Sequence, residues 1–170
     1  MNSSLPIVVI THKPHAQVMD MLRGSCTVIA NETLESWPKE NLIEHAARAD
    51  ALLVFMPDSA DDAFLAKCPR LKIIAAALKG YDNFDVKACT RRGVWLSIVP
   101  DLLTGPTAEL AMALILGLTR NVAAGDQLVR SGKFRAWRPA LYGAGMRSRV
   151  IGIVGMGKLG RALAQLLTGF

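Results

Sequence analysis

The sequence has few cysteines and no apolar run long enough to cross a membrane. Its 170 residues include three cysteines, Cys26, Cys68 and Cys89, which form no C-x-x-C pair. Such isolated cysteines predict reduced thiols in a cytoplasmic protein and exclude a disulfide framework or a metal site. The longest apolar stretch, 110–118, is shorter than a membrane span of about 20 residues. The N-terminus also lacks the features of a secretory signal, so we expect no membrane association.

Acidic residues are absent from the last part of the chain. The formal net charge is +6, from 20 basic and 14 acidic residues, and no Asp or Glu follows Asp126. A basic balance fits nucleic acid, a small anionic substrate or no charged partner. The sequence shows no helix-turn-helix or zinc-finger spacing and no ladder of aromatic and basic residues. We therefore expect no nucleic-acid partner.

Short apolar runs alternate with amphipathic segments over the first hundred residues. Strands are predicted at 5–10, 26–30, 51–55, 71–77 and 94–98, and helices at 14–22, 38–49 and 60–66. Nearly continuous apolar strands separated by helices are typical of a parallel sheet with both faces covered. The predicted fold class is therefore α/β, with a flavodoxin-like parallel sheet in a substrate-side domain over residues 1–100.

The pattern changes after residue 100. Thr107 is the predicted N-cap of a helix over 108–120 that is apolar on nearly every side, and a second helix is predicted over 121–131. So apolar a helix must be buried, and we expect it to form the interface of a homodimer. Burial inside one subunit is the alternative. Residues 101–148 are interpreted as a linker with dimerisation helices.

A glycine-rich motif follows the next predicted strand. The sequence V-G-M-G-K-L-G contains G-x-G-x-x-G at the start of a helix, which predicts a dinucleotide site. Gly155 allows a tight turn, Gly157 lets a pyrophosphate approach the backbone, and Gly160 lets the helix pack on the strand. The first helical amides, near Lys158 and Leu159, are expected to bind the phosphates. A glycine-rich turn without a ligand is the alternative.

Only the beginning of this second domain is expected within the chain. A strand, turn and helix need a following parallel strand to complete a βαβ unit of about 30 residues. Residues 149–170 are therefore interpreted as the truncated first strand-turn-helix of a Rossmann NAD-binding domain. The acidic residue that contacts the ribose would fall beyond Phe170, so the motif does not separate NAD from NADP. A complete small domain whose last helix packs on the first sheet is the alternative.

A lysine stands in a turn directly after the fourth predicted strand. Residues 77–85 read A-L-K-G-Y-D-N-F-D. Ligands of open α/β sheets bind outside the carboxyl ends of the strands, so Lys79 stands where a positive charge can meet an anion. Met56, after the third strand, belongs to the same edge. A solvated surface lysine is the alternative, and His12, His15 and His45 are interpreted as surface residues.

Several of these runs resemble the D-isomer-specific 2-hydroxyacid dehydrogenase family over essentially the whole chain. They include the turn at 77–85, P-T-A-E-L-A at 106–111 and G-M-G-K-L-G at 155–160. Within the family, F-M-P-D (55–58), R-G-V-W-L (92–96) and the run at 99–111 are similar to the members that oxidise phosphite to phosphate. The usual hydroxyacid members carry a small residue in place of Lys79.

The resemblance implies an NAD-dependent oxidoreductase that takes hydride from phosphite. The roles it implies are phosphite binding for Lys79, a backbone N–H from Gly80, a pocket wall from Met56, a place near the nicotinamide for Thr107, and pyrophosphate contacts at Lys158 and Leu159. The family's catalytic Arg, Glu and His would follow Phe170, so the chain alone is expected to be inactive. Two alternatives remain: an enzyme of D-2-hydroxyacids, and a non-catalytic chain whose apolar helix serves association.

Overall fold

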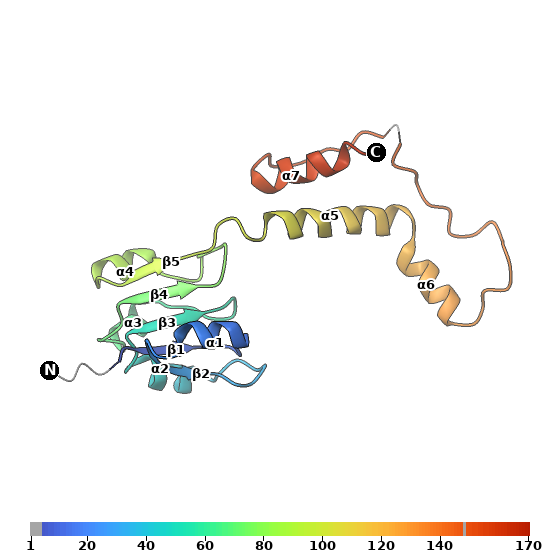
Figure 1. Cartoon of the computed structure of the whole chain (residues 1–170). Coiled ribbons are helices and arrows are strands. Elements are labelled where there is room, and N and C mark those ends of the chain that lie inside the picture. Colours follow the sequence, from blue (N-terminus) through green and yellow to red (C-terminus); the bar gives the residue numbers. More distant parts are fainter. Residues whose placement is uncertain (1–4, 148) are drawn as a thin grey trace. The chain divides into compact units, whose positions relative to one another are not determined.

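The computed structural model describes residues 5–147 and 149–170, and the chain divides into two compact units, Met1–Asp101 and Leu102–Phe170 (Figure 1). The first unit contains the sheet, and the second is helical with a long connecting loop.

The first unit is built on a five-stranded parallel sheet in the order β2-β1-β3-β4-β5. Its strands are β1 (Ile7–Ile10), β2 (Thr27–Ala30), β3 (Ala51–Val54), β4 (Ile73–Ala76) and β5 (Trp95–Ser97). This order is flavodoxin-like, and it confirms the predicted α/β fold class. Each strand is shorter than its predicted apolar run, because the flanking residues belong to the turns.

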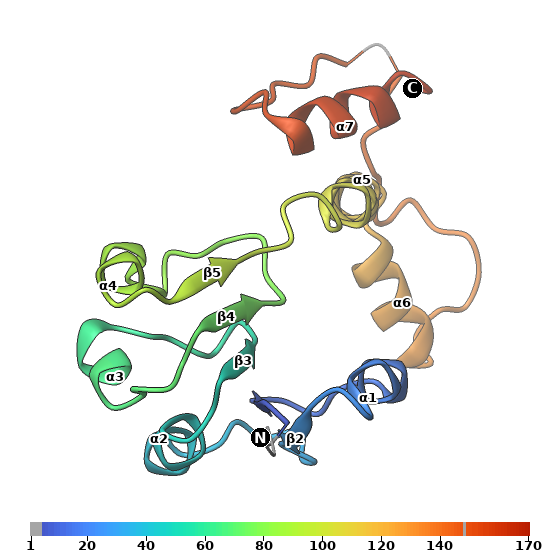
Figure 2. The same cartoon turned by 60° about the vertical axis from the view of Figure 1, so that its left-hand side comes forward.

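Helices cover both faces of this sheet unequally. They are α1 (Ala16–Leu22), α2 (Lys39–Ala46), α3 (Asp62–Ala66) and α4 (Val86–Arg91). Figure 2 shows α1 on one side of the sheet and α2, α3 and α4 on the other. Val9, Leu52 and Ile74 lie in register on adjacent strands and are almost fully buried in the main core. The main core therefore lies on the face of these residues, and Val8 and Ile10 are buried on the other face of β1.

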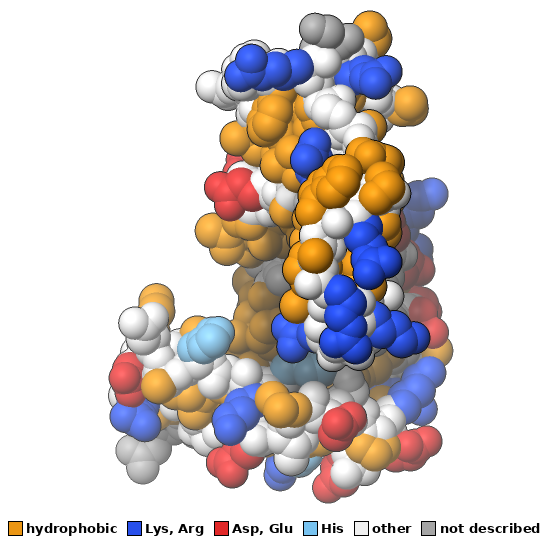
Figure 3. Space-filling model, turned by 90° about the vertical axis from the view of Figure 1, so that its right-hand side faces the viewer, with side chains coloured by type: hydrophobic (Ala, Val, Ile, Leu, Met, Phe, Trp, Pro, Cys, Tyr) orange, Lys and Arg blue, Asp and Glu red, His pale blue; other side chains and the backbone are white. Residues whose placement is uncertain are grey.

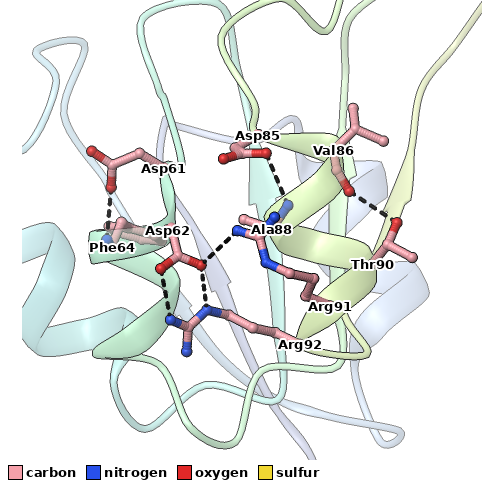
Figure 4. A network of polar contacts seen from close by, with 9 residues as sticks. All are labelled: Asp61, Asp62, Phe64, Asp85, Val86, Ala88, Thr90, Arg91 and Arg92. Atoms are coloured by element: carbon pink, nitrogen blue, oxygen red, sulfur yellow. Dashed lines mark hydrogen bonds and ion pairs between the residues drawn. The ribbon is translucent and has the colours of Figure 1, made fainter.

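Helix α4 was not predicted from the sequence. It begins after Asp85, whose carboxylate accepts a hydrogen bond from the backbone N–H of Ala88 at 2.8 Å (Figure 4). The side chain of Asp62, in the first turn of α3, forms ion pairs with Arg91 and Arg92 of α4 at 3.2 and 2.9 Å. These exposed pairs join two neighbouring helices, and they belong to the fold rather than to a site.

The second unit contains α5 (Thr104–Thr119), α6 (Val122–Arg130) and α7 (Lys158–Leu167), and α7 packs along α5 (Figure 1). Helix α5 begins at Thr104 with Leu103 as its N-cap, so the prediction of Thr107 as the N-cap is wrong. The backbone N–H of Thr107 already donates to the carbonyl of Leu103 at 3.1 Å. Pro106 is tolerated in the first turn because its missing N–H would have no acceptor there.

The strand predicted at 149–154 does not form in this structure. These residues pair with no other strand in the described part of the chain. Val150 and Val154 are fully exposed. A strand requires a neighbour for its backbone N–H and C=O groups, and none lies beside this segment here.

Helices α5 and α6 have the length and apolar composition of a membrane span only when they are taken together. Among residues 5–147 and 149–170, no single helix is long and apolar enough to cross a bilayer. The two helices together are long and apolar enough, and the chain bends by 62° between them.

Candidate functional site

Met56 and Lys79 follow two neighbouring strands at the carboxyl edge of the sheet. Val54, the last residue of β3, lies in register with Ala76, the last residue of β4. The turns that follow these strands therefore start side by side. Both Met56 and Lys79 are exposed, and the Met56 side chain is 77% accessible. The edge thus presents the Lys79 ammonium group, which suits a small anion, beside the apolar side chain of Met56.

Gly80 and its neighbours leave backbone accessible beside Lys79. A Cβ on Gly80 would meet no heavy atom within 4 Å, so packing does not require glycine here. The backbone N–H of Val99 donates to the carbonyl of Leu78 at 2.7 Å, which fixes the start of the turn. An anion could approach the main chain at Gly80 without displacing a side chain.

A polar network that the sequence analysis missed lies at the same edge. Its members are Thr11, Asn31, Asp58 and Asn83. Thr11 and Asn31 directly follow β1 and β2, and this position is the signal that could have revealed them. Asp58 and Asn83 lie further along the segments after β3 and β4, where no comparable signal marks them. Thr11, Asn31 and Asp58 are buried, so their hydrogen bonds are shielded from water.

Two histidines are less exposed than predicted. The His12 ring lies edge-on to Phe55 with centroids 5.4 Å apart, and its Nε2 is buried. The His45 ring packs against Trp37 at 4.6 Å. Aromatic neighbours therefore cover part of these two rings, so that His12 and His45 are half-buried, whereas His15 is exposed. Within the described ranges, no three His, Cys, Asp or Glu side chains are grouped to hold a metal ion.

The glycine-rich loop adopts a closed turn at the start of α7. Gly155 has a φ of +94°, in the left-handed region that favours glycine. A Cβ on Gly160 would lie 2.2 Å from the carbonyl oxygen of Gly155, so glycine is required at this close approach. Gly157 is the N-cap of α7, and a Cβ there would meet nothing within 4 Å. This open side would let a pyrophosphate reach the backbone.

The first turn of α7 supplies the groups that such a pyrophosphate needs. Lys158 and Leu159 are its first residues, and Leu159 is exposed. The first amides of a helix have no acceptor within it, and the helix dipole favours negative charge there. The loop therefore fits a dinucleotide phosphate. Thr107 is an exposed residue of α5, and its place near a nicotinamide stays a prediction.

A loop with basic and aromatic residues, 131–147, is tied to the end of α5. The Asn121 side-chain amide donates to the carbonyls of Leu141 and Tyr142 at 3.3 and 3.0 Å. With α6 the loop lines a cavity of about 530 Å³, whose walls include Phe134 and Trp137. Figure 3 looks at α6 and this loop and shows basic side chains beside hydrophobic ones. We assign this cavity no role.

The fold, the sheet edge with Met56 and Lys79, and the glycine-rich loop at the start of α7 agree with the comparisons with known proteins. Residues 8–160 match the family described as D-isomer specific 2-hydroxyacid dehydrogenase, catalytic domain. The chain belongs to this family, whose members are NAD(P)-dependent oxidoreductases.

Individual relatives support the same assignment. A glyoxylate reductase of Pyrococcus furiosus is 38% identical over 170 residues, which cover 97% of this chain and 51% of the relative. The solved structure of the TT0316 protein from Thermus thermophilus is 31% identical, with a TM-score of 0.91 over 96% of this chain and 53% of that chain. The pyruvate reductase of Chlamydomonas reinhardtii is 27% identical, with a TM-score of 0.77 over 97% of this chain and 49% of that chain. The chain thus spans about half the length of these relatives.

Proposed function

We propose that this chain is the substrate-side part of an enzyme that moves hydride between a nicotinamide cofactor and a small anion. The observation that carries the proposal is the exposed Lys79 in the turn that follows β4, beside the turn that carries Met56. A fixed ammonium group at the carboxyl edge of a parallel sheet binds and orients an anion by charge.

The glycine loop supports the cofactor part of the proposal. The left-handed Gly155, the close approach at Gly160 and the first amides of α7 suit the pyrophosphate of NAD or NADP. The nicotinamide, when bound, supplies the hydride chemistry. The residues of this chain hold and orient the two reactants.

Two classes of substrate have support from different observations. The relatives favour a 2-oxoacid and its 2-hydroxyacid, since glyoxylate and pyruvate reductases match nearly the whole chain. Phosphite is favoured by Lys79 within the run 77–85, because an oxyanion without a carbon skeleton must be held by charge and hydrogen bonds alone. In phosphite oxidation, a water oxygen would bond to phosphorus, the P–H bond would break, the hydride would pass to NAD and a proton would leave.

The test uses the full-length protein with both substrate classes. NADH formation is measured with phosphite and NAD, and NADH or NADPH consumption is measured with glyoxylate and pyruvate. Turnover with any of these substrates supports hydride transfer on a small anion. The ratio of the rate with phosphite to the rates with glyoxylate and pyruvate identifies the substrate class. Absence of turnover with every one of these substrates would refute the proposal.

Lys79→Ala then tests the binding residue. Loss of one charged contact to a desolvated anion costs about 2–5 kcal/mol, so KM for the anion should rise by more than tenfold. Lys87→Ala is the matched control, because Lys87 is an exposed lysine on α4 away from the strand ends. Equal kinetics in the two variants would show that Lys79 is only a surface residue.

A further inference from the structure

Four polar side chains cross the carboxyl edge of the sheet in the same order as the strands. Asn31, Thr11, Asp58 and Asn83 follow β2, β1, β3 and β4. The Asn31 amide donates to the carbonyl of Thr11 at 3.0 Å, and the Thr11 hydroxyl donates to Oδ2 of Asp58 at 2.5 Å. The Asn83 amide donates to the carbonyl of Asp58. One hydrogen-bonded chain therefore joins four strand ends.

Asp58 is at the centre of this chain and closes the turn that carries Met56. The same Oδ2 that accepts from Thr11 also accepts from the backbone N–H of Phe55 at 2.7 Å. The backbone N–H of Asp58 donates to the carbonyl of Phe55 at 3.0 Å. Met56 lies between these two anchored residues. Because Asp58 is 9% exposed, little water competes for these hydrogen bonds.

The turn that carries Lys79 is attached to the same aspartate. Besides the Asn83 side chain on the carbonyl of Asp58, the backbone N–H of Ala60 donates to the carbonyl of Asn83 at 3.2 Å. The backbone N–H of Asp85 in turn donates to the carbonyl of Ala60 at 2.9 Å. Residues 58–60 of the segment after β3 are thus hydrogen-bonded to residues 83–85 of the segment after β4.

We propose that Asp58 is a positioning residue that fixes the Met56 turn and the Lys79 turn relative to each other. For its catalytic consequence this inference rests on the proposed function, since it makes Asp58 set the geometry of anion recognition without touching the anion. Substrate sites need their contact residues held closely by supporting hydrogen bonds. Asp58 supplies this support through a carboxylate on one turn and a backbone carbonyl on the other.

Asp50 offers a matched control at the opposite edge of the sheet. It is also buried, and its Oδ2 also accepts a backbone N–H from the segment of β1, that of Ile7 at 3.0 Å. Asp50 precedes β3 directly, whereas Asp58 follows it. Replacing either removes a buried carboxylate, but only Asp58 contacts the two turns of the candidate site.

Hydrogen exchange on the 170-residue chain tests the coupling directly and needs no activity. In Asp58→Ala, the amide of Phe55 loses its carboxylate acceptor and should exchange about tenfold faster than in Asp50→Ala. The amides of Ala60 and Asp85 keep their backbone acceptors, and they should also exchange faster because the turns that hold those acceptors loosen. Acceleration that stays within 55–58 and leaves Asp85 unchanged would overturn the proposal. Equal acceleration throughout both variants would overturn it as well, because it would show a general loss of stability.

A second variant covers the case in which Asp58→Ala fails to fold. Asn83→Ala removes the side-chain hydrogen bond between the turns, to the carbonyl of Asp58, and leaves the side-chain contacts of Asp58 in place. It should accelerate exchange at Ala60 and Asp85 and leave the amide of Phe55 protected. Loss of protection at Phe55, or unchanged exchange at Ala60 and Asp85, would contradict the coupling.

Kinetics of the full-length protein test the consequence for the anion. Asp58→Ala and Asn83→Ala should raise KM for the anion at least about tenfold. Asp58→Asn should bring KM most of the way back to the wild-type value, because its amide oxygen can accept both hydrogen bonds. Unchanged KM in both Ala variants would overturn the positioning role. An inactive wild type would refute the proposed function alone, because the exchange experiment still decides whether Asp58 couples the turns.

Discussion

A Cβ on Gly160 would lie 2.2 Å from the carbonyl oxygen of Gly155 and 3.2 Å from its carbonyl carbon. The backbone of Gly155, at a φ of +94°, therefore lies directly against the first turn of α7. This is the close approach that a dinucleotide-binding turn requires. It forms although 149–154 pairs with no strand among the described residues. The turn is thus set by its own glycines and not by a surrounding sheet.

Gly160→Ala should destabilise the second unit. The added methyl group would meet backbone at Gly155, which cannot move aside as the end of a flexible side chain would. Overpacking of this kind costs about 1–3 kcal/mol. Urea denaturation of the 170-residue chain, followed by circular dichroism, should show a lower midpoint for the helical signal.

Gly157→Ala is the control for this prediction. Its Cβ would meet nothing within 4 Å, and its φ of −74° suits alanine, so the midpoint should stay close to that of the wild type. In the full-length protein the same change should weaken NAD binding, because the methyl group would occupy the side open to a pyrophosphate. Equal midpoints for Gly160→Ala and the wild type would show that the turn relaxes freely.

The apolar pattern of the sequence predicted the five strands of the first unit but not every other element. The five apolar runs became the five strands, because a short continuous apolar run is typical of a strand that is covered on both faces. Helix α4 was missed because its clearest mark in the sequence is the single cap at Asp85, and one capping residue does not define a helix. The strand at 149–154 was predicted but did not form, since pairing requires a neighbouring strand that no local pattern provides.

The same distinction applies to the candidate site. The rule that ligands bind at the carboxyl ends of parallel strands was enough to place Met56 and Lys79 at one edge. The contact between Thr11 and Asp58 joins residues 47 positions apart. It exists because β1 and β3 are neighbours in the sheet, and that order follows from the fold as a whole.

The buried cysteines should be unreactive in the folded chain. Burial raises the pKa of the Cys68 thiol to about 11, and burial together with the charge of Asp85 raises the pKa of Cys89. Because the thiolate is the reactive form, neither should be alkylated quickly at neutral pH. Cys26 is partly exposed and free, so mass spectrometry should find a single fast modification there. Urea should make all three reactive, whereas rapid labelling of folded Cys68 would contradict its burial.

Asp50 should make the stability of the first unit change with pH in the acid range. The hydrogen bond from the Ile7 N–H, aided by the charge of Arg70 at 3.0 Å, lowers the pKa of Asp50 below its usual value of 3.8 despite partial burial. A lowered folded-state pKa gives stability that is present above 3.8 and is lost as pH falls through the folded value.

The Asp50→Asn variant checks this sign. It should lower Tm at neutral pH and differ less from the wild type at strongly acid pH, as measured by thermal denaturation over a pH series. Asp20→Asn is a suitable control, because the ion pair of Asp20 with Arg23 is exposed on α1. A Tm difference that stays constant over the whole series would show that the charge of Asp50 contributes nothing.

An apolar stripe on α5 should hold two copies of the full-length protein together. Leu110, Leu114 and Leu118 lie four residues apart on one face of the helix and are 59%, 64% and 81% exposed. A groove of about 670 Å³ between α5 and α6 runs beside Leu114 and Leu118. Contiguous exposed leucines of this kind mark an association surface.

We expect a homodimer, and Leu114→Asp should dissociate it in analytical ultracentrifugation, because each copy would bury an unpaired carboxylate. Gln127→Asp, on the exposed side of α6, should leave the dimer intact. A Leu114→Asp protein that still sediments as a dimer would show that the stripe is covered within one subunit.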